Sequence, residues 1–421
     1  MKNDPLSKKT YVFGKKSEDK NGLLSIGKFY ALDGSYGKNV YLDAKYPHII
    51  SIFGKRGYGK SYTMGVFIEE IANLDTEIKN DLSVIIIDTL GIYWTMKYPN
   101  KKEEDILDKW DLKPDAIDIN VYRPKISDVK DDEITDDFLS IPAYLLSADV
   151  WCQLFDVKPT SSFGIALIQA INNLKEKYLD FSLEEIFDEI KNNVAHTKEI
   201  KNIAENFYHY ARSLGIFSNE ESCIERIFKP GSINIIDISN LPGIHLKQMI
   251  TGIISELIFQ KRVLARRLEE IDQMKKQKNS DYVPKIWMAI DEAQIFLPKH
   301  MDHYSKTVLI EHWLRQGRQP GLSLILATQQ PSAIDQEVFS HSDLVFCHRL
   351  TSQHDIKALH QIRPSYMHEN IESIIEKMGH EKGVCNIIDD TMEQAHICKI
   401  RPRKTWHGGN EPKITKHINI K

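Results

Sequence analysis

The stretch SIFGKRGYGKSYTM, residues 51–64, contains residue types and spacing suited to binding phosphate. Gly54 is followed, after four residues, by Gly59, Lys60 and Ser61, which is the spacing of a phosphate-binding loop. Glycines allow the backbone dihedrals that point successive N–H groups at one anion where a helix begins. Lys60 would reach the β- and γ-phosphates of a nucleoside triphosphate, and the Ser61 hydroxyl would ligate Mg²⁺. We expect ATP to be bound by Gly54, Gly57, Tyr58, Gly59, Lys60, Ser61 and Tyr62.

A metal-bound triphosphate also needs a carboxylate at the end of a neighbouring buried strand. The stretch IWMAIDEAQ provides Asp291, and Glu292 follows directly. We expect Asp291 to orient the waters of the Mg²⁺ and Glu292 to act as general base on the attacking water. A tandem acidic pair after a strand can also simply cap a helix, but the phosphate-binding loop favours the metal role.

Other polar residues follow apolar runs in the same way. Gln329 follows the run in LILATQQPS and is able to contact the γ-phosphate or the lytic water. Asp88 ends the run VIIID, where it would either touch the site or cap the next turn. Arg315, Arg318 and Arg349 are candidates for stabilising charge on the γ-phosphate, although any one arginine of this kind is more often a surface ion-pair residue.

These side chains need a framework that brings several strand ends together. The run HIISIF leads directly into the glycine loop, and KSYTMGVFIEEIANL has apolar residues at helical spacing. Apolar runs separated by helical patterns imply a mainly parallel sheet covered by helices on both faces, and hence an α/β fold. The further strands are expected in SVIIIDT, GSINIIDIS, KIWMAIDEA, LSLILATQ, DLVFCHRL and GVCNIID.

The pattern along the chain predicts five segments. Residues 1–47 alternate short apolar runs with Gly, Asp and Asn, which indicates a short N-terminal β segment. Residues 136–228 are helical in pattern and predict an inserted bundle of about four helices. The ATPase core would occupy 48–135 and 229–400, and 401–421 would be a C-terminal tail.

The composition limits the kinds of partner. The chain has 421 residues and a formal net charge of -4, so any contact with nucleic acid must come from a local basic surface. The basic run at 261–278 is interleaved with acidic residues, which favours a solvated helix face over a DNA track. The five cysteines form no CxxC pair, and His300, His303 and His312 lack the spacing of a metal site. With no signal-peptide pattern or membrane-length apolar run, we expect a cytoplasmic protein without a membrane partner.

Four stretches in fixed order resemble the HerA branch of the HerA/FtsK superfamily of P-loop ATPases. They are GKRGYGKS, IDEAQIFLP, LRQGRQPGLSLILATQQPSAID and IRPRKTWHGG, and the resemblance spans roughly residues 22–410. It implies a RecA-like core that forms a hexameric ring and moves double-stranded DNA through its pore, often with a nuclease or another effector protein. The roles that it implies are Lys60 and Ser61 in the nucleotide loop, Asp291 and Glu292 at the metal and water, Gln329 as sensor and Arg318 as an arginine delivered to a neighbouring subunit.

Two features depart from the pattern of that family. Only about 47 residues precede the loop strand, where relatives usually carry a fuller β-barrel, and His48 stands where relatives often place an arginine. We therefore hold two hypotheses: an ATP-hydrolysing ring motor on double-stranded DNA, and a nucleotide-dependent hexameric scaffold that activates an effector enzyme, for example in antiviral defence. A monomeric P-loop enzyme that phosphorylates a small molecule is a third.

Overall fold

The computed structural model describes residues 11–15, 21–31, 33–125, 133–217, 223–276, 282–359 and 371–409. Within these residues the strands form one sheet in the order β1-β3-β2-β13-β12-β11-β4-β10-β9-β5-β8-β6-β7. The strands are β1 Tyr11–Phe13, β2 Leu23–Tyr30, β3 Tyr36–Asp43, β4 Ile49–Phe53, β5 Leu82–Asp88, β6 Asn120–Arg123, β7 Asp137–Phe138, β8 Ile233–Asp237, β9 Lys285–Ile290, β10 Leu322–Thr328, β11 Leu344–His348, β12 Val384–Asp389 and β13 Gln394–Ile400.

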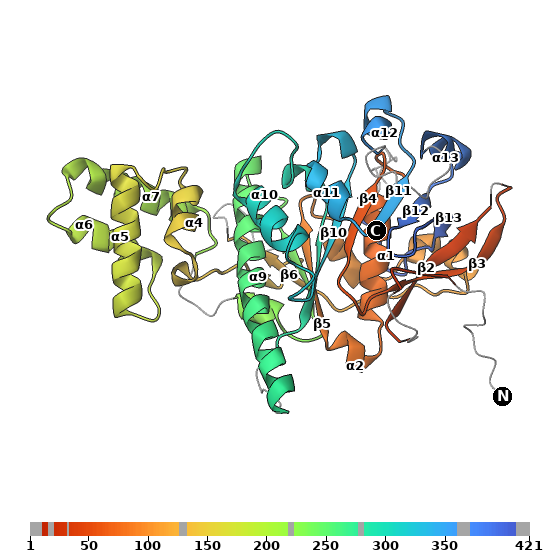
Figure 1. The fold of residues 1–421 in the computed structure, drawn as a ribbon, viewed down its shortest axis with the longest axis horizontal. Helices are drawn as coiled ribbons and strands as arrows, with labels where there is room; N and C mark the ends of the chain where they lie inside the picture. The colour runs from red at the N-terminus through yellow and green to blue at the C-terminus, as the bar shows by residue number, and fades with distance from the viewer. Residues whose placement is uncertain are drawn as a thin grey trace, which may run out of the picture.

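The helices lie on both faces of this sheet (Figure 1). The α-helices are α1 Lys60–Ala72, α2 Thr76–Lys79, α3 Glu104–Asp108, α4 Ala148–Leu154, α5 Ser162–Lys177, α6 Leu183–Asn192, α7 Lys198–Ser213, α8 Cys223–Ile227, α9 Ile244–Lys275, α10 Tyr304–Val308, α11 Gln336–His341, α12 Gln353–Leu359 and α13 Ile371–Lys377. Short 3₁₀ turns lie at Tyr93–Lys97, Lys101–Glu103, Ala143–Leu145, Ala293–Ile295 and Pro331–Ala333, and a π-helix at Leu309–Leu314 continues α10.

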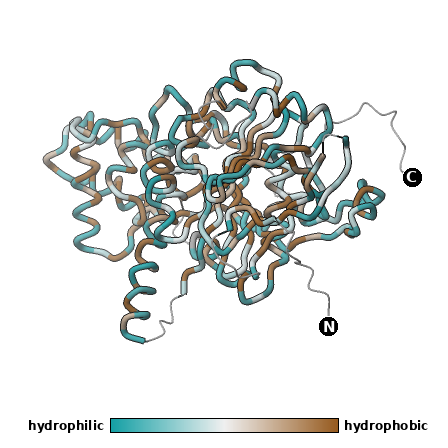
Figure 2. The backbone as a smooth tube through the Cα atoms, turned by 45° about the vertical axis from the view of Figure 1, so that its right-hand side comes forward, coloured by the Kyte–Doolittle hydropathy of each residue, from teal (hydrophilic) through white to brown (hydrophobic). Residues whose placement is uncertain are grey.

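The central strands are apolar runs that are buried on both sides, as parallel strands between helices must be. Every residue of β4 is buried, and β4 pairs in parallel with β10 on one side and β11 on the other. Ile50 and Ile52 pack in the same cluster as α1, whereas Ile49 and Phe53 pack in the cluster that contains α9. Figure 2 shows these hydrophobic strands gathered at the centre of the molecule. The prediction of an α/β fold with a mainly parallel sheet is confirmed.

The N-terminal strands extend this sheet on its antiparallel side. β13 pairs with β12 on one side and with β2 on the other, where Cys398 lies opposite Phe29. β2 and β3 form an antiparallel pair, and β1 adds to β3 in parallel. The residues predicted as a separate β segment are therefore continuous with the core sheet in this structure.

The predicted insertion contains the four helices α4–α7 and the short α8, together with the two-residue strand β7. These four helices stand apart from the sheet, beyond α9 (Figure 1). Aromatic rings hold them together: Phe155 lies 4.4 Å from Phe207 and 5.7 Å from Trp151 between ring centroids. Ser182 and Glu185 form a capping box at the start of α6, which fixes where that helix begins.

The far end of α9 extends beyond the sheet as a largely hydrophilic helix (Figure 2). Its charges pair with one another, as in the contact of Arg266 with Glu270 at 3.1 Å, which fits the predicted solvated face. Arg262 also pairs with Glu269 at 3.0 Å, but it differs from the others in being fully buried, and its Nε donates to the Pro320 carbonyl oxygen at 2.8 Å. In the described part of the chain, every helix is too short or too polar to cross a lipid bilayer.

The start of the predicted C-terminal tail is not a free extension. Residues 401–409 contain no helix, but Arg401, Arg403 and Thr405 are buried against α1. All three contact the carboxylate of Glu69, which is itself fully buried. The rest of the predicted tail, 410–421, lies outside the described residues.

Candidate functional site

The glycine loop connects the end of β4 to the first turn of α1. Gly57 has φ +80° and Gly59 has φ +119°, a region that only glycine enters at little cost. A Cβ at Gly54 would lie 2.7 Å from the His348 Cβ, whereas one at Gly57 would meet nothing within 4 Å. The Gly59 N-cap supplies no side-chain cap to α1, so the first N–H groups of the helix are left for another acceptor. The loop therefore fits a phosphate group.

Lys60 places a cation at this loop with little access to solvent. Its side chain is buried, and in the described part of the chain no carboxylate forms an ion pair with it. Burial lowers the pKa of Lys60, while the charges of Asp291 and Glu292 act in the opposite direction. A buried ammonium is costly unless an anion lies beside it, so the loop favours an anionic ligand.

Ser61 and Asp291, the two residues expected to hold the metal, are in direct contact. The Ser61 Oγ donates to the Asp291 Oδ2 at 2.7 Å, and the Tyr93 hydroxyl donates to the same oxygen at 3.2 Å. Burial raises the pKa of Asp291, and the hydrogen bond from Ser61 opposes this. A hydroxyl and a carboxylate are the oxygen ligands that Mg²⁺ accepts, so the donors present fit that ion.

Glu292 and Gln329 are also in contact, at the ends of the neighbouring strands β9 and β10. Glu292 has φ +53°, an uncommon conformation for a residue with a side chain and one found most often at functional sites. Its Oε1 accepts from the Gln329 Nε2, and its Oε2 accepts from the Gln294 Nε2 at 2.7 Å. Thr328 then donates to the Gln294 Oε1 at 2.6 Å, so the carboxylate is held on both oxygens.

The sequence model of the family described as the central domain of helicase HerA matches residues 24–258, more than half of the chain. The chain belongs to the HerA family. This confirms the predicted HerA branch of the P-loop ATPases, and the nucleotide loop of the HerA core lies inside the matched residues.

Individual relatives are distant. The chain is 23% identical over 349 residues to the DNA double-strand break repair helicase HerA of Pyrococcus furiosus, covering 75% of this chain and 60% of that protein. The HerA of Sulfurisphaera tokodaii is 20% identical over 423 residues, covering 93% and 72% of the two chains. The solved structure of VirB4 from Thermoanaerobacter pseudethanolicus aligns with a TM-score of 0.53 at 13% identity, over 92% of this chain and 98% of that one. That likeness establishes the fold.

The arginines of this HerA-family chain lie at two different edges of the sheet. Arg318 precedes β10, its side chain is 66% exposed, and its nearest carboxylate is that of Asp343 at 3.8 Å. Because β4 and β10 run in parallel, this edge is separated from the loop by the length of β4, roughly 16 Å. Arg315 pairs with Glu311 at 2.7 Å and is a surface ion-pair residue.

Arg349, in contrast, follows β11 directly beside the loop. The Lys55 N–H donates to the Arg349 carbonyl oxygen at 2.9 Å, and the Arg349 Nη1 donates to the carbonyl oxygen of Gly379. Among the described residues its buried Nε has no partner. Of the three arginines singled out in the sequence, Arg349 is therefore the one that lies next to the loop of its own chain.

His348 packs between the start of α1 and β12, next to the loop. No spacing in the sequence indicates this role. Burial lowers the pKa of His348 to about 4, so its ring is neutral. Its Nδ1–H donates to the Val384 carbonyl oxygen at 3.0 Å, and its Nε2 lies 2.9 Å from the hydroxyl of Thr63 in α1. The ring also lies 3.4 Å from where a Gly59 Cβ would be. His348 thus fixes the loop against β12.

Of the two roles expected for Asp88, contact with the site or capping of the next turn, the structure shows the second. Its carboxylate accepts the backbone N–H groups of Leu90, Gly91, Ile92 and Tyr93, all within 3.1 Å, and burial raises its pKa to about 7. This turn positions the Tyr93 hydroxyl on Asp291, a contact that the sequence did not suggest.

The other residues predicted around the loop face different neighbours. The Tyr62 hydroxyl donates to the Glu103 Oε2 at 2.9 Å and accepts the Arg403 N–H at 2.7 Å, so its side chain faces the C-terminal segment. The Tyr58 carbonyl oxygen accepts the Gly383 N–H at 3.2 Å. A role for either residue in binding nucleotide stays a prediction.

His48 lies at the opposite end of β4 from the loop. It is buried, and its two ring nitrogens contact the Asp343 Oδ2 at 2.7 Å and the Asp43 carbonyl oxygen at 2.8 Å. His48 is therefore part of the support at the amino edge of the sheet. In the described part of the chain no group of three or more His, Cys, Asp or Glu is arranged to hold a metal ion.

Proposed function

We propose that this chain hydrolyses ATP with Mg²⁺ and uses the energy, as a homohexameric ring, to translocate or remodel double-stranded DNA. The observation that carries the proposal is the 2.7 Å contact between the Ser61 Oγ and the Asp291 Oδ2. Membership of the HerA family supports it, as do relatives named as DNA double-strand break repair helicases.

Each residue of the site has a part in the proposed hydrolysis. The loop N–H groups and Lys60 would bind the β- and γ-phosphates, and Ser61 with Asp291 would hold the Mg²⁺, which would neutralise charge on the phosphate oxygens. Glu292 accepts the proton of the attacking water. Gln329 orients the Glu292 carboxylate by donating from its Nε2 to the Glu292 Oε1. When ATP is bound, the same amide could instead donate to the γ-phosphate.

The position of Arg318 supports the proposed ring. This arginine is exposed at the amino edge of the sheet and cannot reach the loop of its own chain, which lies at the other edge. A neighbouring subunit whose loop faces that edge would receive it, and an arginine supplied in this way accelerates phosphoryl transfer by roughly 10³–10⁵.

The test is the rate of ATP hydrolysis by the purified protein, with and without duplex DNA. We expect DNA to stimulate turnover, Lys60→Ala to abolish it, and Glu292→Gln to lower kcat by about 100-fold or more while ATP still binds. Glu77→Gln, at an exposed position of α2, serves as the matched control. Hydrolysis that is unchanged in Glu292→Gln would contradict the assignment.

One observation favours a second candidate function. Both Glu292 oxygens are already occupied by glutamine amides, which suits a ring that binds ATP but turns it over slowly. Such a ring would be a scaffold that assembles and activates a nuclease or another effector, for example in antiviral defence. Turnover that responds to a co-purifying protein and not to DNA would favour this scaffold over the motor.

A further inference from the structure

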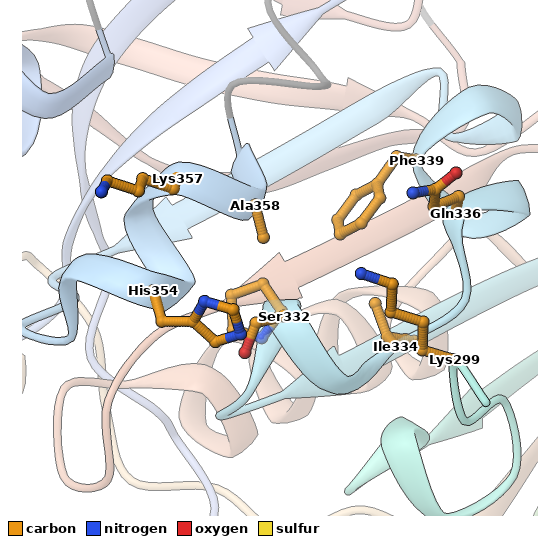
Figure 3. Close-up of a pocket in the computed structure, with 9 residues that line it drawn as sticks. Lys299, Ser332, Ile334, Gln336, Phe339, His354, Lys357 and Ala358 are labelled. Carbon is orange, nitrogen blue, oxygen red and sulfur yellow. The ribbon is translucent and has the colours of Figure 1, made fainter.

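A cavity of about 190 Å³ lies beside the candidate site, on loops that follow the strands of the catalytic residues. Figure 3 shows its lining side chains, which come from the segment after β9, from the segment between β10 and β11, and from α12. The Lys299 ammonium lies between Phe339 and Ile334 (Figure 3). The cavity is lined by Lys299, Pro331, Ser332, Ile334, Gln336, Phe339, His354, Lys357 and Ala358.

Backbone hydrogen bonds join two wall segments of this cavity to each other. The Lys299 N–H donates to the Ala333 carbonyl oxygen at 2.9 Å, and the Asp335 N–H donates to the Leu297 carbonyl oxygen at 2.8 Å. The loops joined in this way begin at the ends of β9 and β10, which carry Glu292 and Gln329. A ligand in the cavity would therefore contact the two segments that also carry Glu292 and Gln329.

Two lysines and one histidine are among the lining residues of the cavity. In the described part of the chain, none of Lys299, His354 and Lys357 forms an ion pair. The neighbouring acidic groups are already engaged. Asp355 accepts from the Ser332 N–H and hydroxyl at 3.2 and 2.7 Å, and Asp335 pairs with Lys306 at 2.9 Å. The Lys299 ammonium, which lies among the lining side chains in Figure 3, favours an anionic ligand, and Lys357 adds a second positive charge on the neighbouring helix α12.

We infer that this cavity receives a phosphodiester group of the nucleic acid on which the ring acts, and that this contact is how nucleic acid influences Glu292 and Gln329. The inference rests on the proposed function and assigns its nucleic-acid contact to particular residues. A chain with a net charge of -4 needs a local basic surface to bind DNA, and the cavity supplies one. The apolar side chains of Ile334 and Phe339 suit the sugar that accompanies each phosphate.

The test compares two double variants of the full-length chain. Lys299→Gln with Lys357→Gln removes the lysines of the cavity, and Lys109→Gln with Lys113→Gln removes two exposed lysines that do not line it. Binding of a fluorescein-labelled duplex of random sequence is measured by anisotropy over a series of salt concentrations. We expect the cavity variant to bind about 10-fold more weakly and its log–log salt slope to fall by about 1–2, since each phosphate contact contributes about 0.9. ATP turnover without DNA should stay at the wild-type rate.

The outcomes separate this inference from the proposed function. Wild-type protein that binds no duplex would overturn both. Wild-type protein that binds duplex, with an identical affinity and salt slope in the cavity variant, would overturn the inference alone. Unchanged duplex binding together with lost binding of a co-purifying acidic protein would assign the cavity to that protein, and would likewise overturn the inference. Recovery of binding in Lys299→Arg with Lys357→Arg would support it.

Discussion

At the scale of single residues, the adjacent carboxylates Asp291 and Glu292 are directed to different partners by the backbone. Asp291 is the first residue after β9 and contacts Ser61 and Tyr93. Glu292, at φ +53°, turns its carboxylate toward Gln329. Because the two carboxylates contact different partners, two neighbouring acids can serve a metal ion and a water molecule separately.

Replacement of Gln329 tests whether it orients Glu292, the proposed general base. In Gln329→Ala the Glu292 Oε1 loses its donor, and we expect kcat for ATP to fall by about 10–100-fold with KM nearly unchanged. Steady-state kinetics measure both constants. Gln330→Ala, one residue further along, is the control and should retain the wild-type kcat. A change in KM with an unchanged kcat in Gln329→Ala would argue against a role in hydrolysis.

The buried His348 should make the stability of the protein depend on pH. Its folded pKa of about 4 lies below the unfolded value of 6.5, so on acidification the unfolded chain binds a proton that the folded chain does not. The free energy of unfolding should therefore fall as pH drops from 6.5 toward 4, by about 2–3 kcal/mol from this group. Denaturant unfolding of His348→Gln should show a loss smaller by that amount. Equal losses in the two proteins would refute the assignment.

The site residues that could be predicted are those that follow a strand recognisable in the sequence. Lys60, Ser61, Asp291, Glu292 and Gln329 each follow a recognisable strand, so the meeting of strand ends in a parallel sheet brings them together. Their catalytic roles remain proposals. The contacts made by Gln294, Thr328, Tyr93 and His348 had no such signal, because each depends on side-chain directions that appear only after the sheet has formed.

At the scale of elements, the C-terminal segment holds the helix that follows the nucleotide loop. Arg401 pairs with Glu69 at 2.8 Å, and the Thr405 N–H and hydroxyl donate to the same carboxylate at 2.9 and 2.6 Å. Burial alone would raise the pKa of Glu69, but Arg401 and Arg403 outweigh it and keep the pKa low. A Cβ at Gly65 would lie 2.6 Å from the Arg403 guanidinium, so α1 needs a glycine there.

Removal of the Glu69 side chain should therefore destabilise the protein strongly. Glu69→Ala leaves the buried Arg403 without its carboxylate and Arg401 with Glu70 alone, and we expect a loss of about 3–5 kcal/mol in the free energy of unfolding. Chemical denaturation measures it, with Glu77→Ala on exposed α2 as the control that should change little. A cost for Glu69→Ala no larger than that of the control would show that the segment does not stabilise α1.

Elements with a strong local pattern could be predicted, and those defined by distant partners could not. The buried runs of β4, β5, β9 and β10 are continuous and apolar. The joining of β13 to β2 pairs Cys398 with Phe29, and nothing near either residue in the sequence identifies its partner. The docking of Arg403 on α1 was missed for the same reason, since a basic residue near a chain end ordinarily lies in solvent.

At the scale of the whole molecule, the candidate site residues lie at two opposite edges of the sheet. The loop, Glu292 and Arg349 lie at the carboxyl edge, whereas His48, Asp343 and Arg318 lie at the amino edge. A site that needs both edges must be shared between subunits. This geometry supports the proposed ring, because a head-to-tail contact repeated around an axis closes into one.

Mixing two inactive variants tests the shared site. Lys60→Ala lacks a working loop and Arg318→Ala lacks the arginine, so we expect each alone to hydrolyse ATP at a few per cent of the wild-type rate or less. Mixed at equal amounts under conditions of subunit exchange, about a quarter of the sites combine an intact loop with an intact arginine. Activity should therefore reappear in the mixture. Its absence, with ring assembly verified by native mass, would place Arg318 outside the reaction.

The most direct measurement of the central claim is ATP-driven displacement of a third-strand oligonucleotide from duplex DNA. A motor that moves along the duplex strips the third strand, and we predict displacement by the wild-type ring only with ATP and Mg²⁺, and none by Glu292→Gln. DNA binding and ATP hydrolysis by the wild-type ring without any displacement would contradict translocation.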